Sequence, residues 1–186
     1  MRGRTEKALS EELALKTMIH KPVQRKLPDH TDDFQTLEKM EWAFSKGDIS
    51  VFQRVLESPS SIMLRVHAVC MLADMKNEEA VSFLCRPLRE DSSPLVRHEA
   101  AFSLGQLGFK SAVPALLQAM KNDGSVLVRH ESAVALGSIG DETSRNGLVE
   151  ALDDPDEDVR LSAECALADL DFLKRLRSRT ETRALP

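Results

Sequence analysis

Two stretches of this 186-residue sequence decide its fold: Val96–Gly108 reads VRHEAAFSLGQLG, and Val128–Gly140 reads VRHESAVALGSIG. Two further segments share the pattern, LRVHAVCMLADM from Leu64 and VRLSAECALADL from Val159. The four segments align on one arginine, at intervals of 32, 32 and 31 residues (Arg65, Arg97, Arg129 and Arg160). A period of this length is typical of a repeat made of two helices.

Each segment carries the spacing of one helix face. A small residue follows the arginine by three positions and a leucine by seven (Ala68, Ala100, Ser132 and Ala163; Leu72, Leu104, Leu136 and Leu167). Because a spacing of four keeps both residues on the same side of a helix, this side is predicted to be the packing seam. The intervening stretches, such as SAVPALLQAMKND from Ser111, carry a second helical stripe. Each repeat is therefore predicted to be two antiparallel helices.

These repeats predict an all-α fold, a HEAT-like αα superhelix of about four repeats. Residues 32–57 read as two more helices, which form an amino-terminal helical cap or a degenerate repeat, with Trp42 as a cap or interface residue. Four glycines lie near the ends of first helices, where left-handed geometry is wanted (Gly105, Gly108, Gly137 and Gly140). We expect a flexible or partly helical extension over residues 1–31, the repeat domain over residues 32–176 and a disordered basic tail over residues 177–186.

Composition excludes several classes of protein. Cys70, Cys85 and Cys165 are few and lack C-x-x-C spacing, which argues against a disulfide framework or a structural zinc site and favours a cytoplasmic location. No apolar run approaches the roughly 18 residues of a membrane span, so no membrane partner is expected. The sequence has no phosphate-binding glycine loop, no His-Glu-x-x-His motif and no Ser-His-Asp set, and it does not favour hydrolysis.

Charge is unevenly distributed along the chain. Both ends are mildly basic, whereas residues 31–174 carry 14 Lys and Arg against 25 Asp and Glu, a net charge of -11. A body of this charge repels nucleic acid and attracts a cationic partner. A solvated acidic surface without a specific partner is the simpler explanation of the same numbers.

The residues that carry chemistry follow the aligned arginine. The outer repeats have Val66-His67 and Leu161-Ser162 at these two positions, whereas the inner repeats have His98-Glu99 and His130-Glu131. Neighbouring helices in such a stack lie about 8 to 10 Å apart, so we expect the four side chains to reach a common point. Imidazole with carboxylate suits iron, manganese or zinc. The alternative is that duplication copied one pair that has no metal, and no catalytic residue beyond these ligands is predicted.

The same segments resemble a known family. VRHEAAFSLGQLG, AVPALLQAMKND, VRHESAVALGSIG and VRLSAECALADLDFL are similar to deoxyhypusine hydroxylase, a HEAT-repeat di-iron monooxygenase of hypusine biosynthesis; more loosely, the repeats resemble those of phycobilisome lyases. The hydroxylase has two similar halves, each with two His-Glu repeats between plain ones. This chain shows that order once, from about Ile49 to Leu176.

The resemblance implies that His98, Glu99, His130 and Glu131 are iron ligands, half of a di-iron set. A twofold homodimer would restore the full set, with two irons per dimer, because an isologous interface joins the same patch of both subunits. The implied substrate is a cationic lysine-derived side chain of a hypusine-bearing translation factor. The competing hypothesis is a non-enzymatic HEAT-repeat scaffold that binds a basic protein partner; a bilin lyase is a less favoured third.

Overall fold

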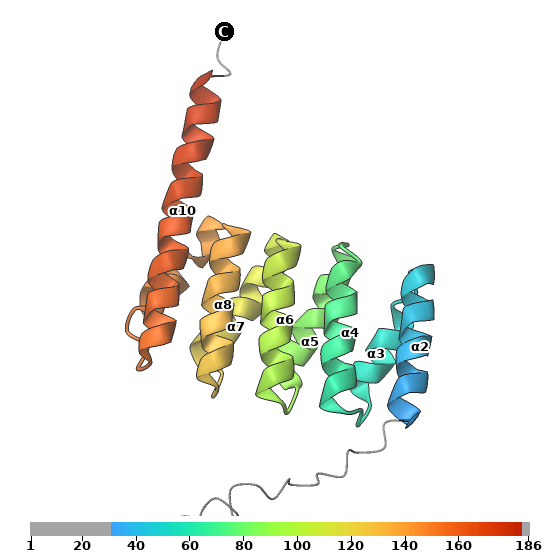
Figure 1. Ribbon diagram of the computed structural model, residues 1–186. Coiled ribbons are helices and arrows are strands. Elements are labelled where there is room, and N and C mark those ends of the chain that lie inside the picture. Colours follow the sequence, from blue (N-terminus) through green and yellow to red (C-terminus); the bar gives the residue numbers. More distant parts are fainter. Residues whose placement is uncertain (1–30, 184–186) are drawn as a thin grey trace, which may run out of the picture. The chain divides into compact units, whose positions relative to one another are not determined.

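The computed structural model describes residues 31–183, in which the chain is a stack of helix pairs (Figure 1). The elements are α2 (Thr31–Lys46), α3 (Ser50–Glu57), α4 (Ile62–Asp74), α5 (Glu79–Glu90), α6 (Pro94–Leu107), η1 (Lys110–Ala112), α7 (Val113–Asn122), α8 (Val126–Ile139), η2 (Glu142–Ser144), α9 (Arg145–Ala151) and α10 (Glu157–Arg183). The even-numbered helices stand side by side in one row, and the odd-numbered helices lie behind them (Figure 1). The predicted all-α, HEAT-like superhelix is confirmed.

The structure describes most of the carboxyl-terminal segment but little of the amino-terminal extension. The extension over residues 1–31, expected to be flexible or partly helical, lies outside the described residues but for Thr31, the first residue of α2. At the other end α10 continues to Arg183, so it includes most of the segment expected to form a basic tail (Figure 1). The domain boundaries drawn from the sequence stay a prediction. Among residues 31–183, no helix combines the length and the apolar composition needed to cross a membrane.

The packing seam brings the even-numbered helices unusually close together. The small residues three positions after each arginine are all buried (Ala68, Ala100, Ser132 and Ala163). Gly108 and Gly140 end α6 and α8 with φ angles of 70° and 66°, as expected for left-handed helix ends. Gly105 and Gly137 do not have that role, because both lie inside their helices.

Their role is close packing. A Cβ atom on Gly137 would lie 2.9 Å from the Cα and Cβ atoms of Ala166, and one on Gly105 would lie 2.8 Å from Ala135 Cβ. The missing side chains therefore let α8 approach α6 on one side and α10 on the other. This close approach allows polar side chains of adjacent helices to touch.

The aligned arginines fasten each repeat to the one before it. In the second repeat, Arg97 donates through Nε and Nη2 to the carboxylate of Asp123 at 2.7 and 2.9 Å, and through Nη1 to the Asp91 carbonyl at 2.8 Å. Asp123 follows α7, the second helix of the same repeat, whereas Asp91 follows α5, the second helix of the preceding repeat. Arg65 and Arg129 make equivalent carboxylate contacts, with Asp91 and Asp154. The recurrence of these arginines thus reflects stacking.

Candidate metal centre

The two His-Glu pairs lie about one turn into α6 and α8. Pro94 is the first residue of α6, where its fixed φ suits the start of a helix. His98 and Glu99 follow it by four and five residues. His98, Glu99 and His130 are half-buried, and Glu131 is 8% exposed. Exposed apolar residues stand three positions before and four after each histidine, on the same helix faces (Leu95, Phe102, Leu127 and Val134). The candidate ligands therefore lie within a partly apolar surface.

His98 contacts the glutamate of the next repeat rather than its own neighbour. Its Nε2 atom lies 3.3 Å from Glu131 Oε2, with side-chain exposures of 22% for His98 and 11% for Glu131. The other ring nitrogen, His98 Nδ1, is buried and has no hydrogen-bond partner in the part of the chain that the structure describes. Within residues 31–183, the carboxylate of Glu131 is thus the charged group that this imidazole contacts.

His130 makes the equivalent contact with a serine. Its Nδ1 atom lies 2.6 Å from Ser162 Oγ on α10, and the same hydroxyl lies 2.7 Å from the Asp158 carbonyl oxygen one turn earlier. Ser162 stands two positions after its aligned arginine, where the inner repeats have Glu99 and Glu131. A single rule therefore relates both contacts: the histidine of one repeat meets the residue one position further along in the next repeat.

Glu99 turns toward the preceding repeat. Cys70 of α4 donates its thiol hydrogen to Glu99 Oε1, at a sulfur-to-oxygen distance of 3.3 Å. Burial, followed by the hydrogen bond to Glu99, raises the pKa of the Cys70 thiol to about 11. The thiol is consequently protonated at neutral pH, as a donor must be, and it is a poor nucleophile in that form.

The four predicted ligands thus form three pairs, Cys70 with Glu99, His98 with Glu131, and His130 with Ser162, instead of meeting at the common point expected from sequence. Within residues 31–183, no three or more His, Cys, Asp or Glu side chains gather closely enough to hold a metal ion. Among the described residues, His98 and Glu131 are the two predicted ligands that lie in contact with each other.

Comparison with known proteins agrees with this architecture. A family model described as HEAT repeats matches residues 83–168. The chain thus has a HEAT-like superhelical fold. Its structure is similar to that of human deoxyhypusine hydroxylase in complex with glycerol, with 35% identity, a TM-score of 0.63, and coverage of 67% of this chain and 44% of that one. This confirms the resemblance read from the sequence.

The second resemblance is also present. The complex of CpcE and CpcF of phycocyanin lyase from Nostoc sp. PCC7120 matches with 26% identity and a TM-score of 0.54, over 69% of this chain and 56% of that chain. The chain thus covers less than two thirds of the length of either protein. No curated protein sequence matches it.

The donors of this chain suit iron in kind but not in number. His98 Nε2 and Glu131 Oε2 lie 3.3 Å apart, and imidazole nitrogen and carboxylate oxygen are donors that would suit iron. The remaining donors of a closed coordination shell must come from elsewhere.

Sequence reasoning missed Cys70 and Ser162. It considered the cysteine as a possible disulfide partner or zinc ligand, and it placed the serine in an outer repeat without a His-Glu pair. The signal for Ser162 was present in the alignment, because it occupies the register position of Glu99 and Glu131. Cys70 stands five positions after Arg65, and nothing in the spacing of the repeats links that position with Glu99.

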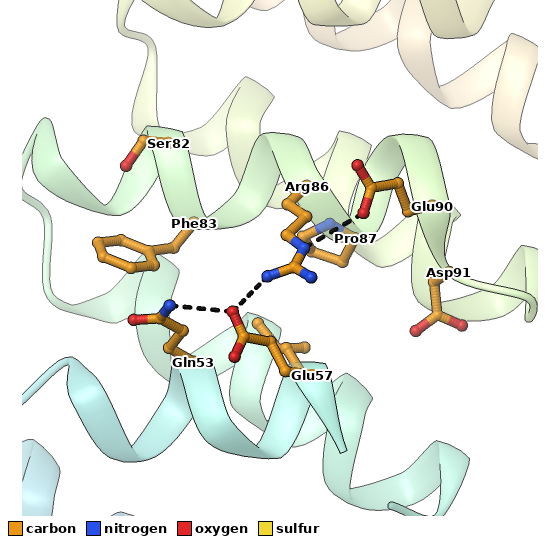
Figure 2. A pocket seen from close by; sticks show the side chains of 9 residues that line it. Gln53, Glu57, Ser82, Phe83, Arg86, Pro87, Glu90 and Asp91 are labelled. Atoms are coloured by element: carbon orange, nitrogen blue, oxygen red, sulfur yellow. Dashed lines mark hydrogen bonds and ion pairs between the residues drawn. The ribbon is translucent and has the colours of Figure 1, made fainter. Parts of the chain in front are cut away.

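A separate pocket lies on the other row of helices. It has a volume of about 380 Å³ and lies between α3 and α5, lined by Leu56, Phe83, Pro87 and several polar residues (Figure 2). Arg86 reaches across it to an ion pair with Glu57 and also contacts Glu90 at 3.2 Å (Figure 2). The positive charge of Arg86 is therefore neutralised within the chain. None of the residues that line this pocket belongs to the two His-Glu pairs.

Proposed function

We propose that this chain is an iron-binding HEAT-repeat monooxygenase similar to deoxyhypusine hydroxylase, assembled as a homodimer. His98, Glu99, His130 and Glu131 of both subunits would hold two irons per dimer. The bound iron would supply oxygen activation. The residues of the chain would bind and orient the metal, and their apolar surroundings would limit the access of water.

The observation that carries this proposal is the incomplete donor set on an accessible face. His98 and Glu131 offer two donor atoms 3.3 Å apart, and no third donor is available among residues 31–183 of the same chain. An isologous dimer presents each such half-set to its symmetry mate. The second subunit is therefore a natural source of the missing ligands.

The surface around the donors supports a dimer. Leu95, Phe102, Leu127 and Val134 are 49%, 41%, 44% and 39% exposed, and they flank the two histidines. Exposed apolar residues that cluster in this way commonly mark an interface. Coverage of 44% of the hydroxylase is likewise the share expected if two copies of this chain replace its two halves.

The charge of the chain supports a cationic substrate. Residues 31–174 carry a net charge of -11, which favours the approach of a protonated amine over that of an anionic substrate. We propose that the substrate is a lysine-derived side chain on a partner protein, such as a translation factor bearing deoxyhypusine.

The test combines metal analysis with oligomeric state. The full chain, loaded anaerobically with ferrous iron and desalted, is expected to retain about one iron per chain and to sediment as a dimer. The double variant His98→Ala/His130→Ala should lose the iron and dimerise more weakly. His67→Ala is the matched control, because His67 is an exposed histidine on α4 outside the His-Glu register, and it should behave as the unmodified protein. A monomer without iron at micromolar concentration after loading would contradict the proposal.

The second candidate function is a scaffold that binds a basic protein without catalysis. It is favoured by the pairing of the candidate ligands with one another and with Cys70 and Ser162, which gives them partners without any metal. Under this hypothesis no iron is retained, and Glu99→Gln changes only the affinity for a basic partner. Iron analysis of the unmodified chain therefore separates the two functions.

A further inference from the structure

The serine beside His130 determines which ring nitrogen carries the proton. A hydroxyl group has a single hydrogen, and a carbonyl oxygen only accepts hydrogen bonds. Ser162 Oγ lies 2.7 Å from the Asp158 carbonyl oxygen, so it must donate its hydrogen there. Its 2.6 Å contact with His130 Nδ1 then requires the imidazole to be the donor. The neutral imidazole of His130 consequently carries its hydrogen on Nδ1 and its lone pair on Nε2.

We infer that Ser162 is a positioning residue that holds His130 in the Nδ1–H tautomer and so keeps Nε2 ready to bind a metal ion. The tautomer stands on the geometry, and only the statement that Nε2 is ready to bind a metal ion rests on the proposed function. Histidines that bind metals usually donate their second N–H to a neighbouring acceptor, which fixes both the tautomer and the ring orientation. Ser162 is suited to this role because it is 7% exposed and is itself anchored to the backbone of α10.

His98 provides an internal comparison. It occupies the same register position in the preceding repeat, yet its Nε2 faces Glu131 and its buried Nδ1 has no partner among the described residues. The contact with Glu131 is an approach of 3.3 Å to a carboxylate, and no hydroxyl group adjoins either ring nitrogen of His98 within residues 31–183. Of these two histidines related by the repeat, His130 is the one whose tautomer a neighbouring hydroxyl group fixes.

Nitrogen-15 NMR of the metal-free full chain tests the assignment, because the two-bond and three-bond couplings of the imidazole ring distinguish the tautomers. Resonances are assigned with His98→Ala and His130→Ala. We expect Nδ1–H for His130. Ser162→Ala should return His130 to a mixture of tautomers, whereas Ser162→Thr keeps a hydroxyl group and should preserve Nδ1–H. Ser138→Ala is the matched control, because Ser138 makes the same bond to the carbonyl four residues earlier, on α8 and away from His130.

Ferrous iron added anaerobically to the same proteins tests whether Ser162 prepares His130 for metal binding. Ser162→Ala should weaken iron binding by about ten- to a hundredfold, and Ser162→Thr and Ser138→Ala should not. Finding His130 as Nε2–H in the unmodified chain would overturn the inference, even if iron binds. If the tautomer is as expected but the unmodified chain retains no iron, the positioning role is overturned together with the proposed function. A fixed tautomer with selective loss of iron in Ser162→Ala supports both.

Discussion

At the scale of the residue, Asp154 illustrates how one side chain joins several parts of the stack. Its carboxylate accepts hydrogen bonds from Arg129 Nε and Nη2 at 2.9 and 3.0 Å and from the Asp156 backbone N–H at 2.9 Å. The hydrogen bonds from Arg129 are the main reason why the pKa of Asp154 lies below its ordinary value. A carboxyl group whose pKa is lowered in the folded state stabilises that state above its ordinary pKa of about 4.

Asp154→Asn is therefore expected to remove a stabilisation that depends on pH. The variant should lose about 2 kcal/mol of unfolding free energy at pH 7, because an amide cannot replace the charge-assisted hydrogen bonds to Arg129. In the unmodified chain this contribution persists above pH 4 and is lost as the pH falls through the lowered pKa, so the difference between the two proteins should shrink below pH 4. Urea denaturation between pH 7 and pH 2.5 measures it.

Asp153→Asn is the control for this experiment, since Asp153 is exposed and lies next to Asp154. It should follow the unmodified chain at every pH. A constant difference between Asp154→Asn and the unmodified chain down to pH 2.5 would contradict the assignment of this pH dependence to Asp154.

At the scale of the element, the candidate site depends on how closely α8 packs against its neighbours. The contact between His130 and Ser162 bridges α8 and α10, and the absence of a side chain at Gly137 lets those helices meet at Ala166. Helix packing and ligand geometry are therefore coupled through one glycine.

Gly137→Ala should destabilise the fold and separate His130 from Ser162. The added Cβ would lie 2.9 Å from two atoms of Ala166, one of them on the backbone, and overpacking of this kind typically costs about 1 to 3 kcal/mol. Urea denaturation measures the loss of stability, and the imidazole NMR spectrum reports the loss of the His130 contact. Gly124→Ala is the control, because its Cβ would meet nothing within 4 Å. Unchanged stability together with an unchanged His130 resonance would show that α8 and α10 do not need this close approach.

The sequence predicted the helices better than the contacts between them. The alignment on Arg97 and Arg129 was sufficient for the helix pairs and for the register that His98 and His130 share. It did not reveal that His98 meets Glu131 alone of the other predicted ligands, because that offset depends on how far one helix is displaced along its neighbour. Gly137 was likewise interpreted as part of a helix end, since nothing in the sequence distinguishes a glycine needed for its φ angle from one needed for close packing.

At the scale of the whole molecule, the described part of the chain is a linear stack in which each repeat contacts mainly its neighbours. Stability in such proteins is approximately a sum of repeat and interface contributions, so the ends can unfold before the centre. Helix α2, the first of the described helices, packs through fully buried Met40 and Ala43, while Phe34 and Trp42 on the same helix are 67% and 62% exposed.

Met40→Ala should therefore loosen one end of the stack and leave the centre intact. Loss of a buried methionine side chain typically costs about 2 to 5 kcal/mol. Hydrogen–deuterium exchange followed by mass spectrometry should show faster exchange in α2 and α3 and unchanged exchange in α8. Phe34→Ala, at an exposed position of α2, should alter neither. Equal acceleration in α2 and α8 would mean that the stack unfolds as one unit.

The arginine contacts have one more consequence, for how such a chain can grow. Asp123 receives Arg97 of its own repeat on its carboxylate and Arg129 of the following repeat on its carbonyl, at 3.0 Å. A duplicate of residues 92–123 inserted directly after Asp123 would find both of these connections already supplied, one on each side. Duplication of this repeat thus preserves the arginine contacts between repeats. Each such duplication adds another His-Glu pair at the same position of the stack.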